Sequence, residues 1–250
     1  MRHLEVMFGV SLLLAPNAAL CGQNGARAIV EKAIEAQGGK KQIAKLRIMR
    51  IKVKGKMEFA PGQKNLPFVL EDTWQMPGQY KSVQRVQLKK GVTHAHTIAV
   101  DGAKGWASFN GQIVDLNKKA MAEFLDQKHG EDLDRLGFLN DKGRKLSVLK
   151  EIKIEGKRAV GVLVKTEGRR DVKLYFDKES GLLVKRERRI SGPAGKEVVQ
   201  EVFFSDYQEK DGLKHYRKIS ALQDGKRLLE GTVTEIEFFD KLDTKVFAKP

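Results

Sequence analysis

The sequence predicts an α+β protein that is mostly β, with a curled antiparallel sheet and a few helices over its concave face. Apolar and polar residues alternate along most of the chain, as in strands that bury one face. Turn signals such as Asp101-Gly102 and Asp211-Gly212 separate these runs. Only two long segments have helical spacing, so a sheet of this many strands must curl or split and leave a concave apolar space.

Composition and charge narrow the functional classes. The chain has 250 residues and a net charge of +15. This basic balance suggests anionic partners. Lys and Arg are spread over most predicted strands, opposite apolar positions, which is typical of a solvated sheet face. We therefore expect no specific nucleic-acid partner, and at most contact between the basic face and a membrane surface.

The first 21 residues have the pattern of a secretory signal peptide. Arg2 precedes an apolar run from Val6 to Ala15, and small residues follow up to Cys21. The run is too short to span a bilayer as a helix. We expect export to the periplasm or cell envelope with residues 1–21 removed, or with Cys21 as a lipid anchor. Because Cys21 is the only cysteine, no intrachain disulfide is possible.

The first half of the remaining chain predicts one helix followed by strands. The helix covers Ala26–Gln37 and ends at Gly38-Gly39, because glycine commonly terminates a helix just past its last turn. A further helical turn is expected over Lys40–Leu46. Four strands follow, with turns at Pro61-Gly62, Pro77-Gly78 and Gly91: Ile51–Phe59, Leu66–Met76, Tyr80–Leu88 and Val92–Val100.

The second half predicts one more helix and then a second run of strands. Asn117 is a suitable N-cap for a helix that extends to about His129. No linker separates the two halves, so residues 26–250 are expected to form a single domain. The later strands are Leu146–Ile154, Arg158–Thr166, a hairpin over Asp171–Ile190, Glu197–Tyr207, Leu213–Leu222 and Leu228–Phe239.

The Asp171–Ile190 hairpin shows how faces are assigned. Val172, Leu174 and Phe176 alternate with polar positions, and the turn closes at Gly181. On the return strand, one set of side chains is expected to be buried, namely Leu182, Val184 and Ile190. The charged run Lys185, Arg186, Glu187, Arg188 and Arg189 is expected to lie mostly in solvent.

Four short motifs occur in a characteristic order: Trp74–Tyr80 around Pro77, Val100–Trp106 around Asp101-Gly102, Phe176–Leu182, and Val246–Pro250. Together they resemble the LolA-like family of periplasmic lipoprotein carriers and outer-membrane lipoprotein-sorting proteins. The resemblance implies an incomplete β-barrel with helices as a lid over an apolar cavity that holds acyl chains. It also implies an arginine just before the motif proline to tether the lid, and Met76 stands there instead.

Candidate ligand-binding residues follow from this architecture. The helix after Asn117 carries Met121, Phe124 and Leu125 on its apolar side, and we expect Phe124 and Leu125 to border the ligand space near Trp106. Each of these positions could equally belong to an ordinary core. Across the space we expect side chains from the facing strands and the lid position: Met57, Phe59, Trp74, Met76, Val162 and Val164.

These features favour a non-enzymatic, monomeric envelope protein that binds a lipid or a lipidated protein. No nucleophile–base constellation is visible, and His94 and His96 have no third metal ligand nearby, so we expect no cofactor or metal. Two alternatives stay open. A filled core with an exposed apolar patch would favour a sensor or interaction module, and a polar cleft with paired carboxylates would favour a hydrolase acting on an envelope polymer.

Overall fold

The computed structural model describes residues 22–58, 65–89, 91–137, 143–192 and 195–250. The predicted signal segment, Cys21 and Phe59 lie outside these ranges. Within them, no helix combines the length and the apolar character needed to cross a bilayer.

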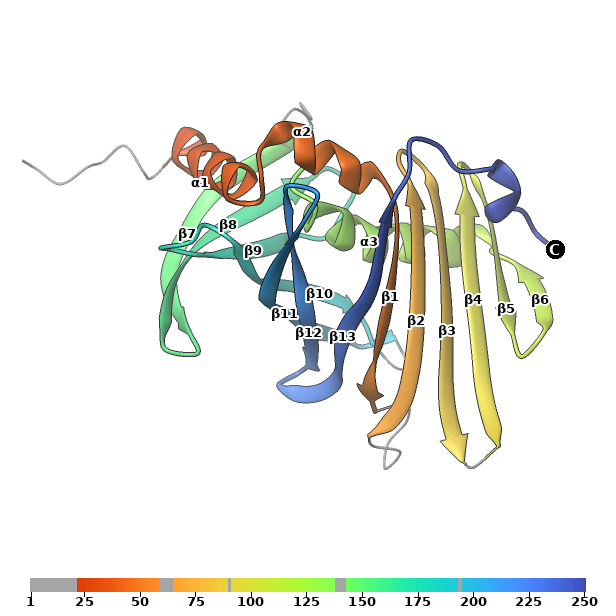
Figure 1. Cartoon of the computed structure of the whole chain (residues 1–250). Helices are drawn as coiled ribbons and strands as arrows, with labels where there is room; N and C mark the ends of the chain where they lie inside the picture. Colours follow the sequence, from red (N-terminus) through yellow and green to blue (C-terminus); the bar gives the residue numbers. More distant parts are fainter. Residues whose placement is uncertain (1–21, 59–64, 90, 138–142, 193–194) are drawn as a thin grey trace, which may run out of the picture.

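In the described part of the chain, thirteen antiparallel strands form one open sheet whose edges are β6 and β7 (Figure 1). At its centre β1 (Ile48–Met57) pairs with β13 (Lys226–Phe238). The early strands extend to one side of this pair: β2 (Leu66–Gln75), β3 (Gln79–Lys89), β4 (Val92–Asp101), β5 (Lys104–Phe109) and β6 (Gln112–Asp115). The later strands extend to the other: β12 (Leu213–Gln223), β11 (Glu197–Lys210), β10 (Leu183–Ser191), β9 (Val172–Asp177), β8 (Lys157–Thr166) and β7 (Arg144–Ile154). The predicted fold class, a curved open sheet with helices on its concave face, is confirmed.

Two long helices, α1 (Gln23–Ala36) and α3 (Lys118–Leu133), cover the sheet, as the sequence indicates. Helix α1 buries Val30, Ala33 and Ile34 in the core and packs on β7 and β8. Helix α3 begins after Asn117, whose side chain accepts a hydrogen bond from the Ala120 backbone N–H at 2.9 Å. The helical segments are α1 (Gln23–Ala36), α2 (Lys40–Ile43), α3 (Lys118–Leu133) and the 3₁₀ turns η2 (Ala44–Arg47) and η4 (Thr244–Val246).

Helix α3 crosses between the two halves of the sheet. In the middle of the helix, Phe124 lies against Tyr80 of β3, with ring centres 5.6 Å apart. Near its end, Gly130 contacts Arg188 of β10 so closely that a Cβ at this position would lie 2.3 Å from the guanidinium. The helix therefore bridges strands that are far apart in the sheet order.

The charged run of β10 corrects one sequence expectation. Lys185, Arg186 and Arg188 are buried instead of facing solvent. Leu183 is buried, whereas Val184 is only half-buried. Two causes act together: the pairing with β9 shifts register after Leu183, and α3 covers this face and supplies partners for the arginines. The helix and the turn after it supply acceptors only to Arg186 and Arg188, whereas Lys185 lies on the opposite face and pairs with Glu187 and Glu201 of the sheet.

The hairpin of β5 and β6 was not predicted as strands. All four residues of β6 are exposed, so the apolar–polar alternation that indicates a half-buried strand is absent there. By contrast, the predicted Asp211-Gly212 turn is confirmed, because both residues adopt positive φ, 52° and 78°, as a tight hairpin requires.

Candidate ligand-binding cavity

A cavity of about 190 Å³ lies on the concave side of the central strands. A water-sized probe needs ~10–15 Å³, so the space holds roughly a dozen heavy atoms, enough for one hydrocarbon chain segment. The walls come from η2 and strands β1, β2, β11, β12 and β13, where alternation turns every second side chain inward. Most of these side chains are apolar: Leu46, Met49, Ile51, Val53, Phe68, Leu70, Trp74, Val202, Ile219, Ala221, Leu228, Leu229, Val233 and Ile236.

Two paired glycines bring the central strands close together beside the cavity. Gly55 of β1 pairs with Gly231 of β13. A Cβ on Gly55 would lie 2.0 Å from the Glu230 carbonyl oxygen, and one on Gly231 would lie 2.6 Å from Val53. Glycine in a strand interior commonly marks such a bend or close approach. The pair therefore allows the tight approach of strands at the centre of the curled sheet.

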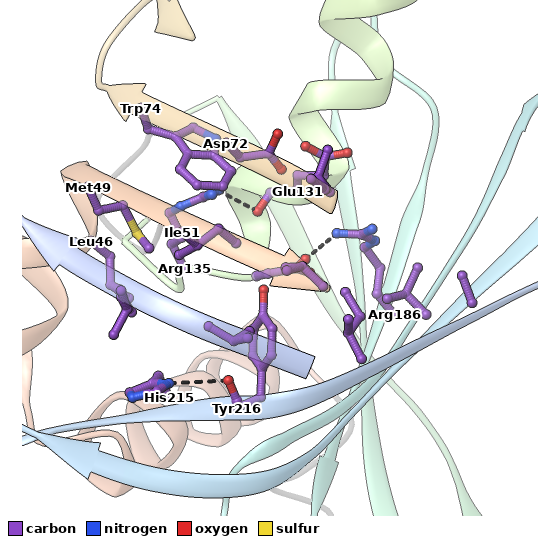
Figure 2. Close-up of a pocket in the computed structure, with 18 of the residues that line it drawn as sticks. Leu46, Met49, Ile51, Asp72, Trp74, Glu131, Arg135, Arg186, His215 and Tyr216 are labelled. Carbon is purple, nitrogen blue, oxygen red and sulfur yellow. Dashed lines mark hydrogen bonds and ion pairs between the residues drawn. The ribbon is translucent and has the colours of Figure 1, made fainter. Parts of the chain in front are cut away.

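One side of the cavity is polar. Figure 2 shows Asp72, Glu131 and Arg186 on one side of the space and Leu46 and Met49 on the other. The polar side chains come from β2, from the end of α3 and from β10, so three distant parts of the chain meet here. This polar set comprises Asp72, Glu131, Asp134, Arg135 and Arg186, and further polar side chains line the cavity elsewhere: Gln37, Gln200, Lys214, His215 and Tyr216.

Asp72 is a buried carboxyl group on the cavity wall. It shares the inward face of β2 with Leu70 and Trp74. The Tyr80 hydroxyl donates a hydrogen bond to Asp72 Oδ1 at 3.0 Å. Burial, reinforced by the nearby Glu131 carboxylate, raises the pKa of Asp72 to about 7. The side chain is therefore partly protonated at neutral pH.

Asp134 and Arg186 form an ion pair across the cavity wall. Burial raises the pKa of Asp134 to about 6, although the Arg186 guanidinium opposes this shift. Four atoms of this wall are buried and have no hydrogen-bond partner in the described part of the chain: Asp134 Oδ1, Arg135 Nε, Arg186 Nε and Trp74 Nε1.

Two cations of helix α3 and the turn after it stack on aromatic rings at the same place. The guanidinium carbon of Arg135 lies 3.9 Å from the centre of the Trp74 ring. Lys128 Nζ lies 4.6 Å from the centre of the Tyr80 ring and 2.5 Å from an Asp132 carboxylate oxygen. Such cation–π contacts fix the end of α3 against β2 and β3.

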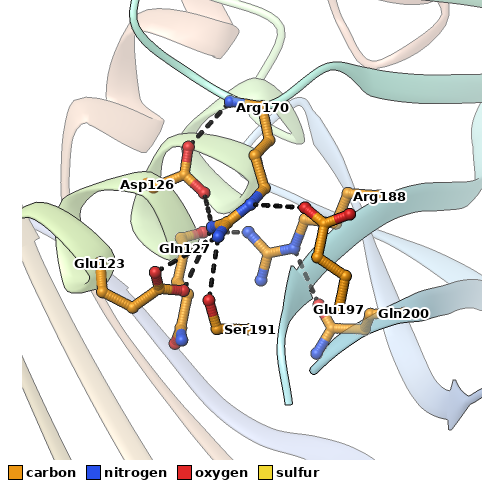
Figure 3. A network of polar contacts seen from close by, with 8 residues as sticks. All are labelled: Glu123, Asp126, Gln127, Arg170, Arg188, Ser191, Glu197 and Gln200. Carbon is orange, nitrogen blue, oxygen red and sulfur yellow. Dashed lines mark hydrogen bonds and ion pairs between the residues drawn. The ribbon is translucent and has the colours of Figure 1, made fainter. Parts of the chain in front are cut away.

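A polar network fastens the middle of α3 to the later strands (Figure 3). Arg170 is its centre and contacts Glu123 and Asp126 of the helix. The same guanidinium donates to Ser191 Oγ at 2.9 Å and lies 3.6 Å from Glu197. The helix that carries the polar wall is thus held from outside the cavity.

The sequence-predicted site residues are placed in several regions. Trp74 lines the cavity. Trp106 is buried on β5, where its indole N–H donates to the Phe247 carbonyl at 3.0 Å. Val162 and Val164 are completely buried in the core.

The other candidates lie outside the cavity lining. Met121, Phe124 and Leu125 are half-buried on α3. Met57 packs against the edge of the core and accepts a long contact from Gln84 Nε2 at 3.7 Å. The backbone N–H of Met76 donates to the Arg47 carbonyl at 2.8 Å.

Sequence reasoning missed the polar wall. One signal was available, because Asp72 occupies an inward position between Leu70 and Trp74 on a strand expected to bury that face. A carboxylate at such a position is costly unless paired, and it often marks a site. Asp134, Arg135 and Arg186 gave no comparable signal, because only the docking of α3 brings them together.

The open curled sheet, the helices over its concave face and the cavity beneath them define a LolA-like fold. Solved structures with the same arrangement cover nearly the whole chain. A LolA superfamily protein from Nitrosomonas europaea matches with TM-score 0.58 and 15% identity, over 90% of this chain and 97% of that one. A domain described as an outer membrane lipoprotein-sorting protein, from Vibrio parahaemolyticus, matches with TM-score 0.53 and 13% identity over 87% and 97%.

A DUF1329 family protein from Desulfovibrio piger gives TM-score 0.58 and 10% identity, over 89% of this chain and 97% of that one. At these identities the likeness is one of fold. No protein-family model matches the sequence. No curated protein matches it significantly.

Proposed function

We propose that this protein is a non-enzymatic envelope protein that binds a lipid, or the acyl chain of a lipoprotein, for transport or sorting. The observation that carries this proposal is the mostly apolar cavity on the concave face of the sheet. Each methylene moved from water into such a space contributes about 0.8 kcal/mol. Ten buried methylenes therefore contribute about 8 kcal/mol, before the entropic costs of binding are subtracted.

The proposed setting is the periplasm or cell envelope. The pattern of the first 21 residues supports export, and the fold shared with a LolA superfamily protein supports the same compartment. We propose a lipid or a lipidated protein as partner, with the basic surface assisting contact with anionic membranes. We further propose that the protein acts as a monomer.

Native mass spectrometry of protein isolated from its own envelope tests the proposal. We expect a co-purifying species of one amphiphile per chain, which organic extraction removes and a fluorescent fatty-acyl probe replaces. Protein that carries no lipid and takes up no acyl probe at micromolar concentration would contradict the carrier function.

A second candidate, a hydrolase, draws on the polar wall. The raised pKa values of Asp72, about 7, and Asp134, about 6, are of the kind found in general acids. Both carboxyl groups already have protein partners, Tyr80 and Arg186, which is why this candidate ranks second. Turnover of chromogenic esters or glycosides that Asp72→Asn abolishes would establish the hydrolase in place of the carrier.

A further inference from the structure

The polar wall of the cavity contains hydrogen-bonding groups that the described protein atoms leave unused. Trp74 Nε1 and Arg186 Nε are donors, Asp134 Oδ1 is an acceptor, and all three, like the further donor Arg135 Nε, are buried without a partner in the described residues. Trp74 and Arg186 are only 2% and 4% exposed. Buried polar groups in folded proteins are nearly always paired. Because all three residues line the cavity, a ligand placed there could supply the missing partners.

The arrangement of charges restricts the kind of ligand. The charged side chains that line the cavity are three carboxyl groups, two guanidinium groups and one ammonium group at the exposed edge: Asp72, Glu131, Asp134, Arg135, Arg186 and Lys214. An anionic head would face the carboxyl groups, and a cationic head would face the guanidinium groups. A neutral head with several oxygen atoms avoids both conflicts.

We propose that this polar wall binds the neutral, hydroxyl-bearing head of a single-chain amphiphile, of the kind that a monoacylglycerol presents. The inference rests on the proposed function and specifies its ligand class. Head oxygens accept hydrogen bonds from Trp74 Nε1 and Arg186 Nε, and a head hydroxyl donates to Asp134 Oδ1. The hydrocarbon chain then lies along the apolar wall on the opposite side.

Other head groups pair with fewer of the unpartnered polar atoms on this wall. An ester without hydroxyl groups accepts from the two donors but offers no proton to Asp134. An ionised carboxylate has the same deficit and adds charge beside Glu131 and Asp134. The cavity volume of about 190 Å³ also favours one chain over two or three.

The test compares four amphiphiles with the same saturated chain: a monoacylglycerol, a methyl ester, a fatty acid and an alkylamine. Each amphiphile competes with a fluorescent acyl probe for binding to the exported protein at pH 7.5. We expect the monoacylglycerol to bind at least 10-fold more tightly than the methyl ester. The variant Trp74→Phe keeps the aromatic ring but lacks the N–H, so this preference should fall about 3- to 10-fold, as for one lost hydrogen bond.

Two further variants separate a specific role from a structural one. Arg186→Lys keeps a cation for Asp134 but lacks Nε, and it should lower the same preference. Trp106→Phe removes an indole N–H that bonds to Phe247 away from the cavity, so it should leave the preference unchanged.

Two results would overturn the inference while leaving the carrier function intact. One is tighter binding of the fatty acid or the amine than of the monoacylglycerol. The other is an unchanged head preference in folded Trp74→Phe and Arg186→Lys protein. Failure of all four amphiphiles and the acyl probe to bind would contradict both proposals at once.

Discussion

Arg170 and Asp126 are joined twice. Arg170 Nη1 lies 2.6 Å from Asp126 Oδ2, and the backbone N–H of Arg170 donates to Asp126 Oδ1 at 2.9 Å. Asp126 belongs to α3, whereas Arg170 lies in the turn before β9. This double link fixes the helix to the later half of the sheet. The position of the polar cavity wall at the end of α3 therefore depends on contacts made in the middle of the helix.

Replacing Arg170 should loosen helix α3. Arg170→Ala leaves Asp126 and Glu123 without their cation, and we expect a loss of about 1–3 kcal/mol in unfolding free energy, because the group is only partly shielded from water. The unfolding free energy of Arg170→Lys should lie between those of the parent and Arg170→Ala, since an ammonium group keeps the charge but cannot reproduce the bidentate geometry of a guanidinium. Hydrogen exchange of residues 118–133 measures the effect.

Arg158→Ala is the matched control for this change. Its partner Glu151 is an exposed carboxylate, and the pair lies on the surface of strands β7 and β8. A surface pair of this kind contributes at most about 1 kcal/mol. Equal exchange rates in α3 for Arg170→Ala and Arg158→Ala would show that the network does not hold the helix.

Filling the cavity should abolish ligand uptake. Ile219→Trp adds bulk to a side chain on the cavity wall, and we expect at least 10-fold weaker binding of an acyl probe. Overpacking costs about 1–3 kcal/mol, so the protein should stay folded. Val114→Trp, at an exposed position of edge strand β6, should bind like the parent. Parental affinity in Ile219→Trp would place the ligand elsewhere.

Asp72 should make the protein less stable as the pH rises. Its folded-state pKa of about 7 lies above the ordinary value of 3.8, so the folded state binds the proton more tightly than the unfolded chain does. The contribution of protonated Asp72 to the free energy of unfolding is fully present below pH 3.8, and it declines as the pH rises to about 7. Asp72→Asn still accepts the Tyr80 hydrogen bond but carries no charge. In urea unfolding, the free energy of unfolding of Asp72→Asn should exceed that of the parent above pH 4. The difference should reach a few kcal/mol by pH 8 (~1.4 kcal/mol per unit of pKa shift).

His129 should have the opposite dependence. Burial, together with the charges of Arg144 and Arg169, lowers the pKa of His129 to about 4. The unfolded chain therefore takes up the proton first, and stability should fall as the pH drops from 6.5 to about 4. His129→Gln removes this titration, so the variant should lose less stability on acidification than the parent. Parallel stability curves for the two proteins between pH 4 and 7 would contradict the assignment.

The elements that local patterns determine were predictable. Helix α3 begins after Asn117 because the cap is local: the Asn117 side chain accepts from the backbone N–H of Ala120, three residues further on. The Asp211-Gly212 turn is equally local. The faces of β10 were not predictable, because the burial of Arg186 and Arg188 depends on a helix more than fifty residues away, as the separation of 52 between Arg186 and Asp134 shows.

The two tryptophans show the same limit for the candidate site. Trp74 and Trp106 have similar sequence surroundings, each on an alternating strand near a glycine turn. In the structure Trp74 lines the cavity with an unpaired N–H, whereas Trp106 bonds to the C-terminal segment. Only contacts between distant segments distinguish a cavity wall from a structural anchor, and no single-sequence pattern records them.

The pairing of β1 with β13 has a consequence for how the molecule is made. These strands form the middle of the sheet and both line the cavity, yet paired residues such as Lys52 and Glu235 are 183 positions apart. A topology with such high contact order folds slowly, because its longest loop must close before the central contacts form. The cavity therefore cannot form on a chain that lacks β13. Its apolar walls stay uncovered until this last strand joins the sheet, so the whole sheet must fold before the cavity can be occupied.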